Sequence, residues 1–193
     1  MSAITMVTSL PNLLTVSRIA TIPVIVATFY IDGNTARWVA CVLFVAAAIT
    51  DFFDGYVARR RNIVSSLGRF LDPIADKLLV AAVLLMLVAF DRVSGFSVLP
   101  ALVILLREIL VSGLREFLAE LKVGMPVSPL AKWKTGIQMT ALPVLLVGDA
   151  AAPPWIPAQT LGEICLWAAA ALTLITGWDY LRAGLKHMKG PKG

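Results

Sequence analysis

Long hydrophobic stretches alternate with short, turn-rich breaks along this chain. Six stretches approach the ~20 residues that a helix needs to cross a bilayer, and they cover residues 12–31, 36–58, 70–90, 96–121, 131–147 and 160–185. The breaks between them, such as residues 32–34 and 152–154, are rich in Gly, Pro, Asn and Asp, which favour turns. The pattern predicts an all-α integral membrane protein with six transmembrane helices, forming one domain over residues 1–193.

The composition agrees with a lipid environment. Hydrophobic residues make up 59% of the 193 positions and charged residues only 15%, and the mean hydropathy is +0.83. An ordinary soluble domain carries roughly a quarter charged residues. The net charge of +5 could indicate nucleic acid, but the basic residues are not interleaved with an aromatic platform, so we expect no nucleic-acid partner.

The basic residues also predict an orientation. Only Arg37 and Arg92 lie in the breaks on one side of the predicted bundle. The other side, formed by two breaks and the C-terminal segment, holds Arg59, Arg60, Arg61, Arg69, Lys122, Lys132, Lys134, Arg182, Lys186, Lys189 and Lys192. Cytoplasmic loops carry an excess of Lys and Arg. The bias predicts that both termini face the cytoplasm.

Four aspartates lie at the cytoplasmic ends of the second and third stretches: Asp51, Asp54, Asp72 and Asp76. The spacings of three within the first pair and four within the second place each pair on one face of a helix. Carboxylates that are close together and partly buried repel one another and are costly in lipid, so they need compensating positive charge.

Two sources of that charge are open. The aspartates could be interfacial residues paired with Arg59, Arg60 or Arg69, although four acids on two adjacent helix ends argue against a purely structural role. The alternative is divalent metal. Ligation by carboxylates alone favours Mg²⁺ or Mn²⁺ over Zn²⁺, and a two-metal site suits phosphate chemistry. We therefore expect two Mg²⁺ or Mn²⁺ ions at Asp51, Asp54, Asp72 and Asp76.

Small residues and an arginine accompany the aspartates. Gly55 and Gly68 allow a helix or a ligand to approach the backbone closely, and Ala58 is small for the same reason. Arg59 offers a guanidinium fork that suits phosphate.

A second group of charges interrupts the fourth stretch and opens the fifth. The fourth stretch carries Arg107, Glu108, Arg115 and Glu116. For the two glutamates we favour ion pairing that aligns helices. The arginines, together with Lys132 and Lys134, predict a cationic pocket for a small phosphorylated substrate beside the metal site.

The aspartate region resembles a known family. Asp51-x2-Asp54-Gly55-x2-Ala58-Arg59-x8-Gly68-x3-Asp72-x3-Asp76 matches the signature of the CDP-alcohol phosphatidyltransferases at every defined position. Further matches run from Pro11 to Lys134 and beyond, and these resemble the bacterial branch that uses glycerol 3-phosphate as acceptor.

The resemblance implies a fold, an activity and residue roles. It implies a six-helix membrane bundle of the CDP-alcohol phosphotransferase type, a homodimer, and an active site at the cytoplasmic face of a bacterial inner membrane. The reaction would transfer a phosphatidyl group from CDP-diacylglycerol to glycerol 3-phosphate and release CMP. Asp76 would be both a metal ligand and the general base. The CDP-diacylglycerol would contact Asn12, Gly55, Ala58, Arg59, Ser65 and Gly68.

Two other classes remain open. A sister enzyme could use phosphatidylglycerol, inositol phosphate or serine as acceptor, and the cationic residues weaken serine only. A divalent-cation transporter would also place carboxylates in membrane helices, but near the midplane rather than all at one end.

Overall fold

The computed structural model describes residues 10–61, 66–120 and 129–188, without the side chains of 10–13, 52–61, 66–70, 72–73, 183 and 186–188. Over these residues the chain is helical and has no strand. The elements are α2 (Leu10–Thr28), α3 (Asn34–Arg61), α4 (Ser66–Ala89), the short 3₁₀ helix η1 (Gly95–Ser97), α5 (Val98–Glu120), α6 (Pro129–Ala151) and α7 (Ala158–Met188). Each predicted stretch therefore corresponds to one long helix, with bounds that differ by a few residues.

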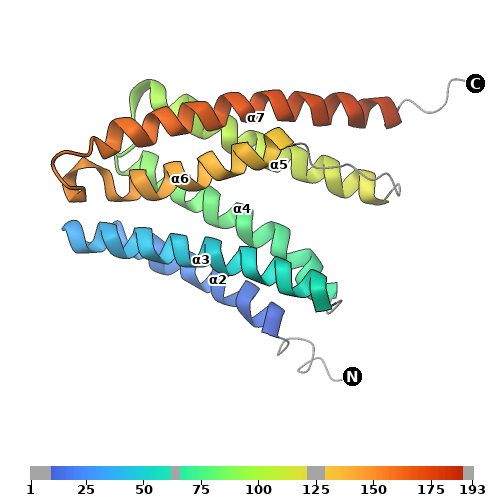
Figure 1. Cartoon of the computed structure of the whole chain (residues 1–193), viewed down its shortest axis with the longest axis horizontal. Coiled ribbons are helices and arrows are strands. Elements are labelled where there is room, and N and C mark those ends of the chain that lie inside the picture. Colours follow the sequence, from blue (N-terminus) through green and yellow to red (C-terminus); the bar gives the residue numbers. More distant parts are fainter. Residues whose placement is uncertain (1–9, 62–65, 121–128, 189–193) are drawn as a thin grey trace, which may run out of the picture.

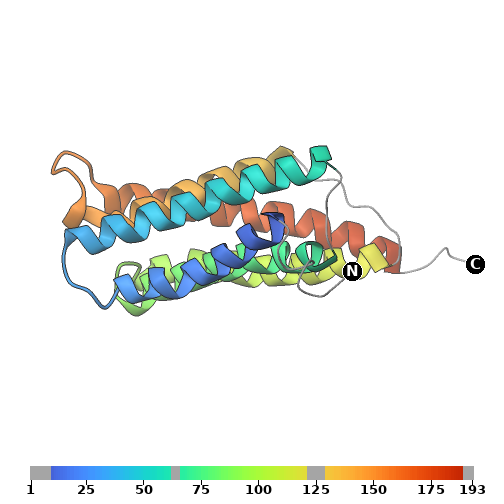
Figure 2. The same ribbon diagram turned by 90° about the horizontal axis from the view of Figure 1, so that it is seen from below.

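The helices run roughly along the long axis of the molecule (Figure 1). Helix α2 packs against α3 and α4, α3 packs against α6, and α7 packs against both α5 and α6. The view in Figure 2 shows α3 and α6 on one side of the bundle and α4 and α5 on the other. The first residues of α2 and the last residues of α7 lie toward the same end (Figure 1), opposite the turn that joins α6 to α7.

The interior of the bundle is apolar. Phe44, Leu79, Val83, Ile104 and Leu145 are at most 1% exposed and belong to one core. Between helices that lie in lipid there is no hydrophobic driving force, so these side chains stabilise the bundle through close van der Waals packing. Many side chains that face outward are also large and apolar, which fits the lipid environment expected from the sequence.

Two segments of the described chain, Gly95–Glu120 and Ala158–Arg182, are long and apolar enough to cross a membrane. A shorter apolar helix covers Leu14–Thr28. These segments correspond to the fourth, the sixth and part of the first predicted stretch.

The helix ends away from the termini follow local rules. Asp91 adopts a left-handed conformation (φ 53°), and the amides of Arg92 and Val93 both donate to the carbonyl of Leu87, which closes α4. In α6 the regular helix stops at Gly148, whose φ of 59° and ψ of 177° are non-helical. The predicted stretch ended at residue 147, directly before this kink.

Two arginines bind the backbone carbonyls directly before the kink. Arg37 donates to the Val147 oxygen at 3.3 Å, and Arg92 donates to the Leu146 oxygen at 3.0 Å. Burial and the nearby Arg37 lower the pKa of Arg92 to about 10, so it stays charged at neutral pH. These contacts fix α3, α4 and α6 to one another at the end of the bundle opposite the aspartates.

Candidate active site

Two cavities meet at Asp76. One, called here the carboxylate cavity, has a volume of about 400 Å³ and is lined by Phe44, Val45, Ala48, Ile49, Asp51, Asp76, Thr135 and Met139. The other, the cation cavity, has a volume of about 270 Å³ and is lined by Asp76, Lys77, Arg107, Glu108, Val111, Arg115, Ala131, Lys134, Thr135 and Tyr180. Asp76 and Thr135 belong to both, so one carboxylate faces two chemically different spaces.

Asp51 is held by an arginine from another helix. The Nη1 of Arg18 in α2 lies 2.6 Å from the Asp51 Oδ1, and the side chain of Arg18 is only 2% exposed while that of Asp51 is 41% exposed. Charge compensation from arginine was one of the two possibilities for the aspartates. For Asp51 an arginine of α2 supplies that charge, while the side chains of Arg59, Arg60 and Arg69 lie outside the described residues. The exposed part of the carboxylate remains on the cavity wall.

The predicted metal ligands can be followed only in part. Asp51 on α3 and Asp76 on α4 line the same cavity. Asp54 and Asp72 belong to the same two helices, but their side chains lie outside the described residues. Among the side chains that are described, no group of three or more His, Cys, Asp or Glu gathers as a metal site. Two carboxylates on one cavity wall, without histidine or cysteine, suit a hard divalent cation.

The cation cavity contains a compact charge cluster. Lys134 of α6 is only 4% exposed and donates to the Oε1 of Glu108 on α5. Arg107 reaches the same oxygen at 3.4 Å through its Nη1. The ion pairing predicted for Glu108 is thus present and links α5 to α6. Glu108 thereby brings together two of the predicted cations, Arg107 and Lys134.

The cation cavity has an excess of positive charge. Lys77, Arg107, Arg115 and Lys134 supply four positive charges, while Asp76 and Glu108 supply two negative ones. The difference of two charges matches what a phosphate monoester would neutralise. The charges of Lys134 and Arg107, which are 4% and 13% exposed, are weakly screened by solvent. Arg115 is exposed, so its charge is screened more strongly.

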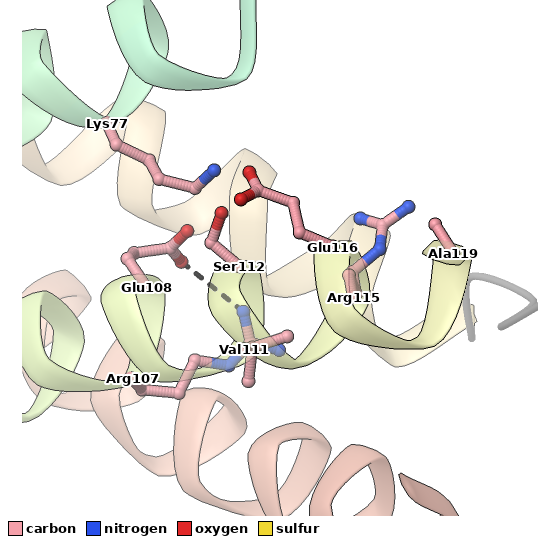
Figure 3. A pocket seen from close by; sticks show the side chains of 8 residues that line it. All are labelled: Lys77, Arg107, Glu108, Val111, Ser112, Arg115, Glu116 and Ala119. Atoms are coloured by element: carbon pink, nitrogen blue, oxygen red, sulfur yellow. Dashed lines mark hydrogen bonds and ion pairs between the residues drawn. The ribbon is translucent and has the colours of Figure 1, made fainter. Parts of the chain in front are cut away.

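A third space, the outer cavity, continues from the cation cavity along α4 and α5 (Figure 3). It has a volume of about 300 Å³ and shares Lys77, Arg107, Glu108, Val111 and Arg115 with the cation cavity. Ser112, Glu116 and Ala119 complete it. In Figure 3 the amino group of Lys77 extends across this space toward α5.

One predicted cation lies apart from the cluster. Lys132 is exposed and lines neither cavity, although it is two residues from the buried Lys134. Its role in acceptor binding stays a prediction. Of the residues predicted to contact the nucleotide lipid, Ser65 lies outside the described residues. Only the backbone is described for Asn12, Gly55, Ala58, Arg59 and Gly68.

Sequence reasoning gave no role to Lys77, Thr135 and Tyr180, which line the cation cavity, or to Arg18, which pairs with Asp51 on the wall of the carboxylate cavity. Arg18 is a buried ionisable residue within a hydrophobic stretch, a signal that usually marks function or pairing. Lys77 directly follows Asp76 and could have been grouped with it. Thr135 and Tyr180 offered no signal, because their place at the site depends on how α6 and α7 pack.

Comparison with known proteins identifies relatives over nearly the whole chain. Residues 8–175 match the sequence model of the family described as CDP-alcohol phosphatidyltransferase. A protein of Rickettsia bellii (strain RML369-C) is 55% identical over 93% of this chain and 97% of its own length. A protein of Cereibacter sphaeroides is 38% identical over 95% of this chain and 99% of its own. A protein of Arabidopsis thaliana is 39% identical over 91% of this chain and 79% of its own. The first two are named CDP-diacylglycerol–glycerol-3-phosphate 3-phosphatidyltransferase, and the third carries the same name followed by the number 2.

The Lys134–Glu108 pair predicts a strong coupling in stability. Lys134→Met should leave the half-buried Glu108 with a weaker counter-charge and lower the free energy of unfolding by about 3 kcal/mol. Glu108→Gln should also destabilise, because it leaves Lys134 without its anionic partner. The double variant should recover at least 1 kcal/mol relative to the sum of the single effects. Denaturation in detergent gives the free energy of unfolding of the parent protein, the two single variants and the double variant. Strictly additive changes in this free energy would show that the two side chains do not stabilise each other.

Proposed function

Because this chain belongs to the CDP-alcohol phosphatidyltransferase family, we propose that it transfers the phosphatidyl group of CDP-diacylglycerol to glycerol 3-phosphate. The products are phosphatidylglycerophosphate and CMP, in the synthesis of anionic phospholipids. The relatives' names supply both substrates and leave the transporter alternative without support. The observation that carries the proposal in the structure is that Asp76 lies on the wall shared by a carboxylate cavity and a cation cavity.

The cation cavity is proposed as the site of glycerol 3-phosphate. Its four cationic side chains exceed its two anionic ones, and guanidinium and ammonium groups form strong, charge-assisted hydrogen bonds with phosphate. Arg107, Arg115 and Lys134 are the proposed phosphate ligands, with Lys77 as a further cation. Lys132 would act from the exposed side of α6.

The carboxylate cavity is proposed as the place where the CDP part of the lipid meets metal. Asp51, Asp54, Asp72 and Asp76 would hold two Mg²⁺ or Mn²⁺ ions, which is consistent with a family that generally depends on divalent cations. When bound, the ions would neutralise the pyrophosphate and stabilise the departing CMP. Asn12, Gly55, Ala58, Arg59, Ser65 and Gly68 would contact the nucleotide lipid.

The shared position of Asp76 suggests how the reaction proceeds. The cation cavity would orient glycerol 3-phosphate through its phosphate, with a free hydroxyl of the glycerol directed at Asp76. The Asp76 carboxylate would accept the proton of that hydroxyl while the hydroxyl oxygen attacks the β-phosphorus of CDP-diacylglycerol. The bond between the β-phosphorus and the bridging oxygen breaks, and CMP leaves with that oxygen. One direct displacement is sufficient, so no covalent enzyme intermediate is needed.

The membrane arrangement is part of the same proposal. All six long helices would cross the bilayer, with the termini and the active site facing the cytoplasm of a bacterial inner membrane. Exposed aromatic side chains near both ends of the helices support this, since Trp and Tyr gather at membrane interfaces. Tyr30, Phe96 and Trp155 lie at one end of the bundle and Trp133 near the other, all at least 70% exposed. The chain would act as one catalytic domain in a homodimer.

Release of CMP by purified protein tests the proposed reaction. With CDP-diacylglycerol as donor, we expect turnover with glycerol 3-phosphate and little with inositol phosphate, phosphatidylglycerol or serine. Excess chelator should abolish the turnover and added Mg²⁺ or Mn²⁺ should restore it. Preference for another acceptor would refute the substrate assignment, and full activity in chelator would refute the metal assignment.

A second prediction separates the roles of Asp76 and Arg115. Asp76→Asn should lower kcat by roughly 10²- to 10⁴-fold, the usual contribution of a general base. Arg115→Ala should raise the KM for glycerol 3-phosphate by about 10- to 150-fold, because it removes a charge-assisted contact to phosphate. The KM for CDP-diacylglycerol should change little in Arg115→Ala.

Steady-state kinetics give kcat and both KM values for each variant, and thermal denaturation shows whether the variant is still stably folded. Near-normal turnover in Asp76→Asn would exclude it as the base. If Arg115→Ala instead lowers stability and affects both substrates equally, Arg115 has a structural role.

A further inference from the structure

We infer that α7 holds Arg107 in place for the acceptor phosphate through three residues, Thr176, Gly177 and Tyr180, called here the Arg107 cradle. The inference rests on the proposed function of the cation cavity and assigns positioning residues for it. Arg107 starts from α5, so α7 supplies the contacts that decide where its guanidinium lies.

A chain of hydrogen bonds fixes the guanidinium. The Nη2 of Arg107 donates to the Oγ1 of Thr176 at 3.0 Å. The Thr176 hydroxyl donates in turn to the carbonyl of Leu172, one turn earlier in α7, at 2.8 Å. Thr176 is fully buried, so water does not compete for this contact. The hydroxyl proton is committed to the helix backbone, and the oxygen is left to accept from Arg107.

The other two cradle residues shape the path of the side chain. A Cβ atom on Gly177 would lie 3.1 Å from the Cγ and 3.5 Å from the Nε of Arg107, so only glycine gives the arginine stem its full space at this point. The guanidinium carbon lies 5.6 Å from the centre of the Tyr180 ring, within the range of a cation–π contact. Tyr180 itself lines the cation cavity.

These contacts matter because Arg107 lies between two very different spaces. One side of it lines the cation cavity. The other side lines a mostly apolar groove of about 290 Å³ between α5 and α7, whose walls include Leu106, Gly177 and Trp178. Within the cavity, Glu108 is a distant partner at 3.4 Å and also binds Lys134. The cradle therefore keeps the positive charge at the acceptor site instead of leaving its position to Glu108 alone.

Two threonines on the same face of α7 provide a matched test. Thr176→Val keeps the shape of the side chain but removes the oxygen that accepts from Arg107. Thr176→Ser keeps that oxygen. Thr173→Val is the control, because Thr173 is equally buried and its hydroxyl has no hydrogen-bond partner among the described residues.

The measurements are the KM for each substrate, kcat and the melting temperature of the full-length protein. We expect Thr176→Val to raise the KM for glycerol 3-phosphate by roughly 10-fold or more, as expected for a lost hydrogen bond to a charged group. The KM for CDP-diacylglycerol should stay the same. Thr176→Ser should remain close to the parent protein, and so should Thr173→Val.

Two glycines of α7 give an independent test. Gly177→Ala would press on Arg107, whereas Gly184→Ala would press on the apolar Leu114, whose Cδ1 would lie 2.8 Å from the new Cβ. A defect selective for glycerol 3-phosphate in Gly177→Ala but not in Gly184→Ala supports the cradle. Equal acceptor KM values in Thr176→Val and Thr173→Val, or equal effects of the two glycine variants, overturn it. Failure of the parent protein to use glycerol 3-phosphate would instead overturn the proposed function.

Discussion

The need to compensate charge between apolar helices governs the active-site end of this structure. Ionised groups removed from water are costly unless an opposite charge or a hydrogen bond accompanies them. Arg18 of α2 forms an ion pair with Asp51 of α3, and Lys134 of α6 forms one with Glu108 of α5. Each pair joins two helices that follow one another in the chain, so the same contacts that satisfy the charges also hold neighbouring walls of the cavities together.

The two cavities differ in the charge that they leave uncompensated. On the carboxylate side, part of Asp51 stays exposed despite its arginine, which suits a site that attracts cations. On the cation side, one glutamate is shared between a lysine and an arginine, which leaves positive charge for an anion. A phosphate-transfer enzyme with one metal-bound substrate and one phosphorylated acceptor needs this division, and Asp76 lies where the two sides meet.

The sequence predicted the helices well because hydrophobic length and turn residues are local signals. The stretch that ended at residue 147 stops at the Gly148 kink, for example. The sequence could not predict contacts between distant residues, such as that of Arg107 with Thr176, which are 69 residues apart. These depend on which faces of α5 and α7 meet. Closeness in the sequence can also mislead. Lys132 and Lys134 were grouped together, but residues two apart on a helix point roughly 200° apart. Only Lys134 faces the cavity.

The proposed metal site at the carboxylate cavity and the proposed acceptor site at the cation cavity adjoin at Asp76. Paramagnetic relaxation measures this directly, with Mn²⁺ as the metal and the phosphorus of bound glycerol 3-phosphate as the nucleus. We expect strong Mn²⁺-dependent relaxation of that phosphorus in the parent protein. Asp51→Asn, by weakening the metal site, should reduce the relaxation at equal acceptor occupancy. Binding of both Mn²⁺ and glycerol 3-phosphate without relaxation of the phosphorus would show that the two sites do not adjoin.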